Sequence, residues 1–300
     1  MTQPPLTIGL PVYNGSRFLP QALTSIQQQT YTDFELLVSD NGSTDDSRDI
    51  VREHARDDER IRLLESPVNR GAAWNYNRVF AESRSALFKW AAADDELEPT
   101  CVARSLEVLE ASDPSVVVVF PVTRMVDEEG NTLREIVDPL DMPVGASAHE
   151  RLRRVVAGAV YGNVVFGLMR SDALRRTRGH GAYPSSDLVL LAELALLGSF
   201  RLVAEPLFLR REHLEMSRKA NPTLEEMSRF FDPQGPVTRH EHARVFVEHL
   251  RAIRRADLSA WEKGRCYQVF LTTWVRRHDE LRIRLARLGG RLRRTRAAET

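Results

Sequence analysis

The sequence predicts an α/β fold in which a mostly parallel sheet is flanked by helices. Two observations lead to this prediction. Short apolar runs alternate with helical segments through about the first hundred residues, which is the pattern of crossover units on a parallel sheet. Polar clusters also follow the apolar runs at their carboxyl ends, where open α/β sheets bind ligands. We therefore expect a ligand-binding crevice along one edge of the sheet.

The strands expected in this first part are short apolar runs that end at polar or turn-forming residues. They are Leu6–Val12, Phe34–Val38, Ile61–Leu64 and Ala86–Ala93. A helical segment is expected after each strand, because apolar residues recur there at helical spacing: 18–26, around 50–51, 72–83 and 99–109. The polar clusters at the strand ends are Tyr13–Asn14, Asp40, Asn69–Gly71 and Asp94–Asp95.

The pattern is less regular after Ser112. A buried strand is expected at Val116–Val122, followed by a surface turn and a loop rich in proline and glycine. Extended pieces are expected at Phe200–Ala204 and Pro206–Leu209. From Leu224 onward the chain is expected to be helical.

Asp187 follows a loop, 178–186, that is rich in glycine and proline and is expected to be mobile. It begins a predicted helix that stops at Gly198. The residue alone is best explained as the N-terminal cap of this helix, and a functional carboxylate is the alternative.

The acid pair Asp94–Asp95 directly follows the apolar run Ala86–Ala93. Adjacent carboxylates at the end of a buried strand repel each other, so they need a cation or hydrogen-bond donors such as ribose hydroxyls. Magnesium or manganese that bridges carboxylate and diphosphate oxygens would meet this need. The alternative is that both acids only cap the next helix.

The composition argues against several classes of protein. Forty-two basic and forty-two acidic side chains give no net charge, so nothing global indicates a nucleic-acid partner. Cys101 and Cys266 are far apart, which excludes a disulfide framework and a cysteine-based zinc site and fits the cytoplasm. No GxGxxG follows the first strand and no GxxxxGK[ST] occurs, which argues against a dinucleotide cofactor or a P-loop. The first residues lack the features of a signal peptide.

The C-terminal end is basic and amphipathic. Between Leu281 and Thr300 there are seven arginines and one acid, and leucines share one stripe. Such a stripe could lie on an acidic membrane surface, which would place the protein peripherally at the inner face of the membrane. The alternative is packing on its own domain or in a homodimer. His240, His242 and His249 do not have the spacing of a metal site and are expected at the surface.

Several segments together resemble the family 2 glycosyltransferases, in the order in which that family has them. They are Leu10–Asn14, Ser39–Asp45, Asn69–Gly71 with Asn77, Ala93–Asp95 with Pro99, Ser186–Asp187 before a helix that ends at Gly198, and Arg211–His213 with Ser217. The resemblance covers about residues 6 to 217. It implies the glycosyltransferase A fold, a Rossmann-like, mostly parallel mixed sheet flanked by helices, here with a helical C-terminal region.

The resemblance also implies a site for a nucleotide-diphosphate sugar at the strand ends. The residues that it implies for donor binding are Pro11, Val12, Tyr13, Asn14, Asp40, Asn69, Gly71, Asn77 and Asp94. Among them, Val12 and Tyr13 would border the base, Asp40 would hydrogen-bond the base edge and Asp94 would contact the ribose. Asp95 and His213 would bind a divalent manganese or magnesium ion, and Asp187 would be the general base.

The implied reaction is an inverting transfer from a UDP-, dTDP- or GDP-sugar to a hydroxyl of a glycan, a lipid-linked molecule or a small molecule. Bacterial cell-surface glycans and specialised metabolites are the expected products. A catalytic domain is expected at 1–217, with a nucleotide-sugar half at 1–112 and an acceptor half at 113–217, and a helical extension at 218–300. The alternatives are a catalytically silent binding scaffold of the same fold and a sugar nucleotidyltransferase, which normally needs a glycine-rich basic loop after the first strand.

Two positions depart from the family's pattern. Ala92 stands where many members carry an additional acid, which leaves two carboxylates for the metal. Tyr76 stands where an arginine is common, which either changes a contact to the nucleotide or affects packing only.

Overall fold

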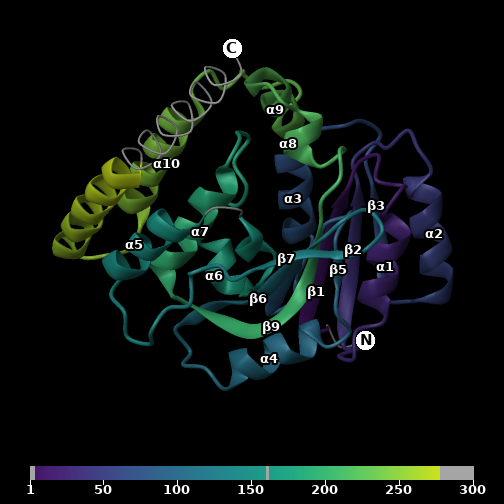
Figure 1. Cartoon of the computed structure of the whole chain (residues 1–300), viewed down its shortest axis with the longest axis horizontal. Helices are drawn as coiled ribbons and strands as arrows, with labels where there is room; N and C mark the ends of the chain where they lie inside the picture. Colours follow the sequence, from purple (N-terminus) through teal and green to yellow (C-terminus); the bar gives the residue numbers. More distant parts are fainter. Residues whose placement is uncertain (1–3, 160–161, 278–300) are drawn as a thin grey trace, which may run out of the picture.

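The computed structural model describes residues 4–159 and 162–277. Its centre is a mixed sheet with nine strands in this described part, and helices cover both faces (Figure 1). The strands are β1 (Leu6–Val12), β2 (Phe34–Asp40), β3 (Ile61–Glu65), β4 (Leu87–Trp90), β5 (Glu96–Leu97), β6 (Val116–Val126), β7 (Thr132–Ile136), β8 (Leu168–Arg170) and β9 (Ser199–Arg211). Their order is β3-β2-β1-β4-β8-β6-β9-β5, and β7 pairs with β6.

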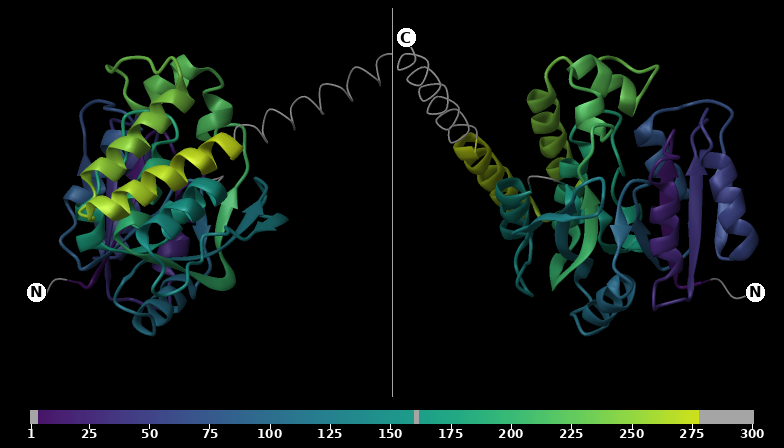
Figure 2. Two further views of the ribbon diagram at one scale, coloured as in Figure 1. Left: turned by 90° about the vertical axis from the view of Figure 1, so that its left-hand side faces the viewer. Right: turned by 45° about the vertical axis from the view of Figure 1, so that its right-hand side comes forward.

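Helices lie in a layer on each face of the sheet, and further helices lie outside these layers. They are α1 (Leu19–Gln27), α2 (Ser47–Asp57), α3 (Ala72–Ala81), α4 (Cys101–Glu110), α5 (Ala148–Gly158), the 3₁₀ helix η1 (Asn163–Phe166), α6 (Ser171–Arg175), α7 (Ser186–Leu197), α8 (Ser217–Ala220), α9 (Leu224–Phe231), α10 (Glu241–Arg255) and helical residues 260–277. The helices α1, α2 and α4 share one apolar core with the sheet, and α3, α5, α6, α7 and α10 share the other. Figure 2 shows α10 and the following helix outside α5 and α7.

The first half of the sheet has the predicted crossover connections. β1 lies between β2 and β4 and is parallel to both. Every residue of β1 is buried, which explains its uninterrupted apolar sequence. The register pairs Val12 with Asp40, so the segments that follow β1 and β2 leave the sheet at the same level.

The second half makes the sheet mixed. β8 is antiparallel to both β4 and β6, whereas β6 and β9 form a long parallel pair. The extended pieces predicted at Phe200–Ala204 and Pro206–Leu209 are both extended in the structure, as parts of the one strand β9. Pro206 pairs with Val122 where the register shifts, so the strand accommodates a residue that lacks an N–H at an irregularity.

The fourth predicted strand is shorter in the structure. β4 ends at Trp90, and residues 91–95 form a turn that leads into β5. β5 pairs with β9 through Glu96 and Leu209. The acid pair therefore lies in a turn between two strands, next to the end of β9.

The C-terminal helices share a core with the sheet. Ile253, Cys266 and Phe270 belong to the same buried cluster as Phe88 of β4. The prediction that His249 is a surface residue was wrong. Its side chain is buried on the apolar face of α10, and its ring stacks on Phe270 with centroids 5.1 Å apart.

No helix within residues 4–159 and 162–277 is both long and apolar enough to cross a bilayer. The basic stretch Leu281–Thr300 lies outside the described residues. Membrane contact through that stretch, a homodimer, a cytoplasmic location and the domain boundaries at 112 and 217 stay predictions.

Candidate active site

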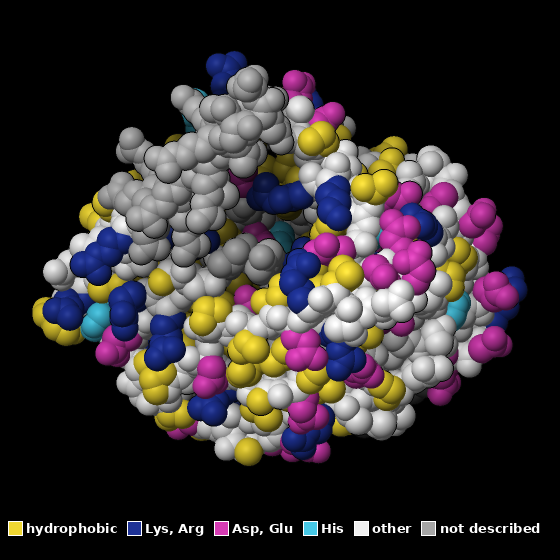
Figure 3. Space-filling view, viewed as in Figure 1, with side chains coloured by type: hydrophobic (Ala, Val, Ile, Leu, Met, Phe, Trp, Pro, Cys, Tyr) yellow, Lys and Arg dark blue, Asp and Glu magenta, His cyan; other side chains and the backbone are white. Residues whose placement is uncertain are grey.

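The carboxyl ends of β1, β2 and β4 open into a cavity of about 950 Å³. Its lining also includes the first turns of α3 and α7, the end of β9 and residues from 215 to 233. The predicted site residues that line it are Pro11, Val12, Tyr13, Asn14, Asn69, Asp94, Asp95, Asp187 and His213. Figure 3 shows the hollow with acidic and histidine side chains inside it and basic side chains at its rim.

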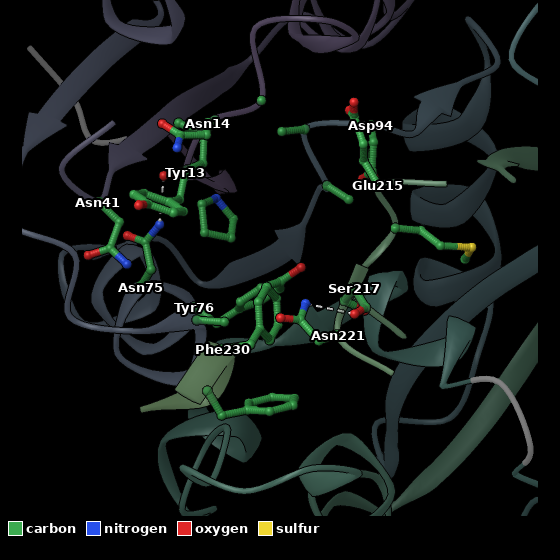
Figure 4. A pocket seen from close by; sticks show the side chains of 18 of the residues that line it. Tyr13, Asn14, Asn41, Asn75, Tyr76, Asp94, Glu215, Ser217, Asn221 and Phe230 are labelled. Atoms are coloured by element: carbon green, nitrogen blue, oxygen red, sulfur yellow. Dashed lines mark hydrogen bonds between the residues drawn. The ribbon is translucent and has the colours of Figure 1, made fainter. Parts of the chain in front are cut away.

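One end of the cavity carries an aromatic ring and several amides. Figure 4 shows Tyr13 close to Asn14, Asn41 and Asn75, away from Asp94 at the opposite end. Tyr13 is 45% exposed although it follows a fully buried strand. The Asn14 side chain accepts a hydrogen bond from the Thr44 amide at 2.9 Å, which ties the loop after β1 to the loop after β2.

Asp40 does not belong to the lining that the described residues form. Its side chain is fully buried. The carboxylate accepts hydrogen bonds from Arg48 Nε at 2.5 Å and from the Ser43 amide at 3.2 Å. The predicted contact between Asp40 and a base edge does not fit this arrangement. Asn41, the next residue, lines the cavity in its place.

Gly71 and Asn77 are also outside this lining. Gly71 has a φ of +89°, and a Cβ there would lie 2.3 Å from the Phe231 carbonyl oxygen, so this glycine allows the end of α9 to pack against the start of α3. The Asn77 carboxamide is engaged on both sides by the backbone of His180, at 2.8 Å in each case. Both residues thus support the walls of the cavity, and their role as donor ligands stays a prediction.

The opposite end of the cavity contains the acid pair. Asp94 Oδ2 lies 2.9 Å from His213 Nε2, and Asp95 Oδ1 accepts a hydrogen bond from the Arg211 amide at 2.9 Å. Asp95 is only 8% exposed. Burial, together with the charge of Asp94, raises the pKa of Asp95 well above its usual range. The ionised pair therefore requires a compensating positive charge.

Arg211 holds the acid turn against the end of β9. Its buried guanidinium donates to the backbone oxygens of Asp127 and Glu128 at 3.0 and 2.9 Å, and to the side chain of Glu96. Its Nε donates to the Asp94 carbonyl at 3.3 Å. The sequence pattern marks Arg211 only as part of a motif, and the structure gives it this anchoring role.

The acid end fits a divalent cation of the magnesium or manganese type. No group of three or more histidine, cysteine, aspartate or glutamate side chains in the described part could by itself hold a metal ion. Sites of this type need only one or two carboxylates, since substrate phosphates and water complete the coordination. His213 contacts Asp94 and lies with the acid pair at this end of the cavity, and the assignment of Asp95 and His213 as metal ligands stays a prediction.

Asp187 lies in the first turn of α7 and faces the cavity. The residue at the N-cap is Ser185, so Asp187 is not the cap. Burial raises the pKa of the Asp187 carboxyl, and the charges of Arg218 and Arg210 act in the opposite direction. A carboxylate with a raised pKa is a better proton acceptor near neutral pH.

Gly162 leaves the space that the Asp187 carboxylate occupies. A Cβ at Gly162 would lie 1.9 Å from Asp187 Oδ2, and Gly162 has a φ of +68°. Gly162→Ala is expected to displace this carboxylate. Turnover should fall by about a hundredfold, because a misplacement of about 1 Å has that effect in a positioned site. Steady-state kinetics at saturating donor would measure the loss.

Gly145→Ala is the matched control for this substitution. Gly145 also has a positive φ, +80°, but no atom of the described chain would lie within 4 Å of the new Cβ. Both variants share the backbone strain, and only Gly162→Ala has the clash. Equal turnover in the two variants would contradict the role assigned to Gly162.

The loop before Asp187 is anchored by side-chain hydrogen bonds in this structure, and its mobility stays a prediction. Arg178 donates its amide to Glu193 Oε2 at 2.8 Å, and His180 is bound by Asn77. Ser185 at the end of the loop is bound by Arg218 at 2.8 Å. The loop therefore forms a wall beside Asp187.

Sequence reasoning missed several cavity residues. Tyr76 lines the cavity among the acids, and burial together with the charges of Asp94 and Asp95 raises the pKa of its phenol. Arg210 also lines it and donates to the side chain of Asn163. Tyr76 was noticeable as a departure from the family pattern. Arg210 and the cavity residues from Asn221 to Pro233 gave no sequence signal.

The sequence profile of Glycosyl transferase family 2 matches residues 7–176, more than half of the chain. The chain belongs to glycosyl transferase family 2. The matched segment contains the acid pair and the loops after β1, β2 and β3, and it stops before Asp187 and His213.

Two curated proteins illustrate the relatives of this chain. A chondroitin synthase of Escherichia coli is 33% identical over 130 residues, which are 43% of this chain and 19% of the relative. A GalNAc(5)-diNAcBac-PP-undecaprenol beta-1,3-glucosyltransferase of Campylobacter jejuni is 28% identical over 133 residues, 44% of this chain and 42% of the relative. The chain thus spans less than half the length of either relative.

Solved structures share the fold. TarS 1–349 of S. aureus, in complex with UDP-GlcNAc, has a TM-score of 0.65 at 14% identity and covers 89% of this chain and 72% of its own. The mannosyltransferase PcManGT of Pyrobaculum calidifontis, in complex with GDP-Man and Mn²⁺, has a TM-score of 0.55 at 18% identity. The match covers 90% of this chain and 74% of PcManGT. These likenesses confirm the predicted glycosyltransferase A fold for this family 2 chain.

Proposed function

We propose that this family 2 protein transfers a sugar from a nucleotide-diphosphate sugar to an acceptor hydroxyl with inversion. The observation that carries the proposal is the meeting of Asp187 with Asp94, Asp95 and His213 around one cavity. A proton acceptor and a site for the leaving diphosphate are the groups that such a reaction needs.

The amide-rich end of the cavity is the proposed nucleoside subsite. Tyr13 offers an exposed aromatic face on which a base can stack, and Asn14, Asn41 and Asn75 surround it (Figure 4). The Asn41 carboxamide is bound on both sides within the protein and shapes this subsite, whereas Asn75 Oδ1 has no hydrogen-bond partner in the described chain. Asn69 Oδ1 accepts a hydrogen bond from Asn41 Nδ2 at 2.9 Å, which keeps the Asn41 amide in a fixed orientation.

The diphosphate is expected at the acid end. Asp94, Asp95 and His213 would hold the manganese or magnesium ion, which supplies positive charge to the departing nucleoside diphosphate. Arg211 keeps the acid turn in place through its four backbone and side-chain acceptors. The structure of PcManGT with GDP-Man and Mn²⁺ supports a metal in a protein of this fold.

Asp187 is the proposed general base. The acceptor oxygen attacks the anomeric carbon, the bond from that carbon to the diphosphate oxygen breaks, and the acceptor proton moves to Asp187. A single displacement of this kind inverts the anomeric centre. The raised pKa of Asp187 suits a residue that must take a proton and later release it.

The acceptor is proposed to be a bacterial cell-surface glycan or a lipid-linked precursor of one. The relatives named as a chondroitin synthase and as an undecaprenol-linked glucosyltransferase support this class. A uridine or guanosine donor is supported by the UDP-GlcNAc and GDP-Man of the two solved structures.

A panel of nucleotides would test the donor site directly. UDP, GDP, dTDP and CDP and their common sugar conjugates are compared by thermal shift, each with and without manganese. One nucleotide class is expected to raise the melting temperature, and only when manganese is present. A ligand at 100 times its Kd adds about 2.7 kcal/mol to the free energy of unfolding, so the shift should be measurable. Release of nucleoside diphosphate from the stabilising conjugate, on addition of acceptor, would then distinguish a transferase from a silent binding scaffold. A complete lack of stabilisation would overturn the proposed donor site.

A further inference from the structure

Ser185 has an unusual backbone conformation two residues before Asp187. Its φ is +59°, in the left-handed region that residues other than glycine, asparagine and aspartate seldom adopt. Its carbonyl accepts the first hydrogen bond of α7, from the Leu188 amide at 3.3 Å. The direction in which α7 begins, and with it the place of Asp187, therefore depends on Ser185 staying in this conformation.

Two side chains from the C-terminal region hold Ser185. Arg218 Nη2 donates to Ser185 Oγ at 2.8 Å and to Glu241 Oε1 at 2.7 Å. Ser185 in turn donates its hydroxyl proton to Glu241 Oε1. The three side chains form a closed triangle in which every polar atom that takes part meets a complementary group. We call these three residues the Ser185 clamp.

The clamp connects parts of the chain that no sequence motif links. Arg218 belongs to α8 and Glu241 begins α10, whereas Ser185 belongs to the anchored loop of the catalytic half. The Glu241 side chain is only 15% exposed, whereas that of Arg218 is 61% exposed. The hydrogen bond between Ser185 and Glu241 is therefore the side of the clamp that is better shielded from water. Such a contact can stabilise a conformation that the backbone alone disfavours.

We propose that Arg218 and Glu241 are positioning residues that hold Ser185 in its left-handed conformation and so place the Asp187 carboxylate in the cavity. The inference rests on the proposed function, in which Asp187 is the base. Neither residue needs to touch the donor or the acceptor. The C-terminal region would then take part in catalysis through geometry, in addition to lining the cavity.

Glu241→Gln tests the clamp because it removes the charge and keeps the size of the side chain. Its turnover at saturating donor and acceptor is expected to fall by about ten- to a hundredfold, as for other sub-ångström to ångström displacements of a reacting group. The stabilisation by nucleotide and manganese in the thermal-shift assay should stay within about twofold in apparent Kd, since the clamp does not reach the donor subsites. Glu248→Gln is the matched control. Glu248 lies on the same helix, its side chain is 11% exposed, and it also pairs with arginines.

Ser185→Gly separates the proposed role from a merely structural one. Glycine adopts a positive φ without strain, so this variant needs no clamp to keep the loop conformation. We expect it to retain turnover within about fivefold of the wild type, and Glu241→Gln in the Ser185→Gly background to have almost no further effect. Ser185→Ala, which keeps the strain and lacks the hydroxyl, should lose turnover as Glu241→Gln does.

Each result has a defined meaning. The clamp would be overturned if Glu241→Gln left turnover unchanged. It would also be overturned if Glu241→Gln reduced turnover equally in the wild type and in the Ser185→Gly background, or if Glu248→Gln reduced turnover as much as Glu241→Gln does. A fall in nucleotide affinity that matches the fall in turnover would overturn it as well, because the effect would then be a general loss of the site. If the wild type neither binds a nucleotide nor releases one, the proposed function itself fails.

Discussion

Asp187→Asn is expected to remove most turnover, by about a hundredfold to ten-thousandfold, while nucleotide affinity stays nearly unchanged. The amide has the shape of the carboxylate but cannot take the acceptor proton. Asp187 lies in the first turn of α7, and the N-cap of that helix is Ser185, so the substitution does not remove the cap. The donor should therefore still bind, and the loss should appear in kcat. Turnover of the donor with acceptor, together with the thermal shift by nucleotide and manganese, measures the two quantities separately.

Asp172→Asn is a suitable control for this substitution. Asp172 also lies in the first turn of a helix, α6, and it is not among the residues that line the cavity within the described chain. An asparagine there should leave turnover unchanged. Activity of Asp187→Asn within a few-fold of the wild type would mean that Asp187 serves only the start of its helix.

Asp95→Asn is expected to weaken manganese-dependent donor binding by about a hundredfold or more. Even residues that only support a metal ligand change metal affinity by about 10- to 100-fold, so a direct ligand should have at least this effect. Binding of the nucleotide without manganese should change little. Titration of the nucleotide at fixed manganese, followed by thermal shift or calorimetry, gives the comparison. Glu215→Gln is the control, since it removes a negative charge from the same cavity, and the ion pair of Glu215 in the described chain is with Arg17, at 4.0 Å.

The pH dependence of metal binding gives a second test of Asp95. Burial and the charge of Asp94 raise the pKa of Asp95, so the metal-free protein keeps a proton there at a pH at which a free aspartate is ionised. A cation must displace this proton. Manganese affinity should therefore rise with pH, by up to about tenfold per unit, and level off above the raised pKa. This rise should be absent in Asp95→Asn. A flat profile in the wild type would remove Asp95 from the metal site.

Sequence periodicity was sufficient to predict the first half of the sheet. β1 has the predicted bounds, Leu6–Val12, and its neighbours β2 and β3 differ from prediction by one or two residues at their ends. Each of these strands is short, apolar and closed by turn formers, so local sequence decides its limits. The second half was harder to predict, because β9 continues through Pro206 by means of a register shift that depends on its partner β6.

The sequence predicted those site residues whose position depends on the end of a strand. It did not predict those whose position depends on side chains far away in the sequence. Tyr13, Asn14 and Asp94 follow strands and reach the cavity as expected. The position of a residue at a strand end does not determine the direction of its side chain. Asp40 was therefore predicted to contact the nucleotide base, whereas in the structure Arg48 binds its carboxylate inside the protein. The contact between Asn77 and His180 spans 103 residues, and no local pattern indicates it.

The packing of α9 against Gly71 has a consequence for how the protein is made. A ribosome that has synthesised the chain as far as Ser217 has produced every segment that resembles the family, from Leu10 to His213. The nascent chain at that moment still lacks the wall from Asn221 to Pro233 and lacks Glu241. A chain that ended at Ser217 would therefore carry every motif and still lack one wall of the cavity and part of the Ser185 clamp.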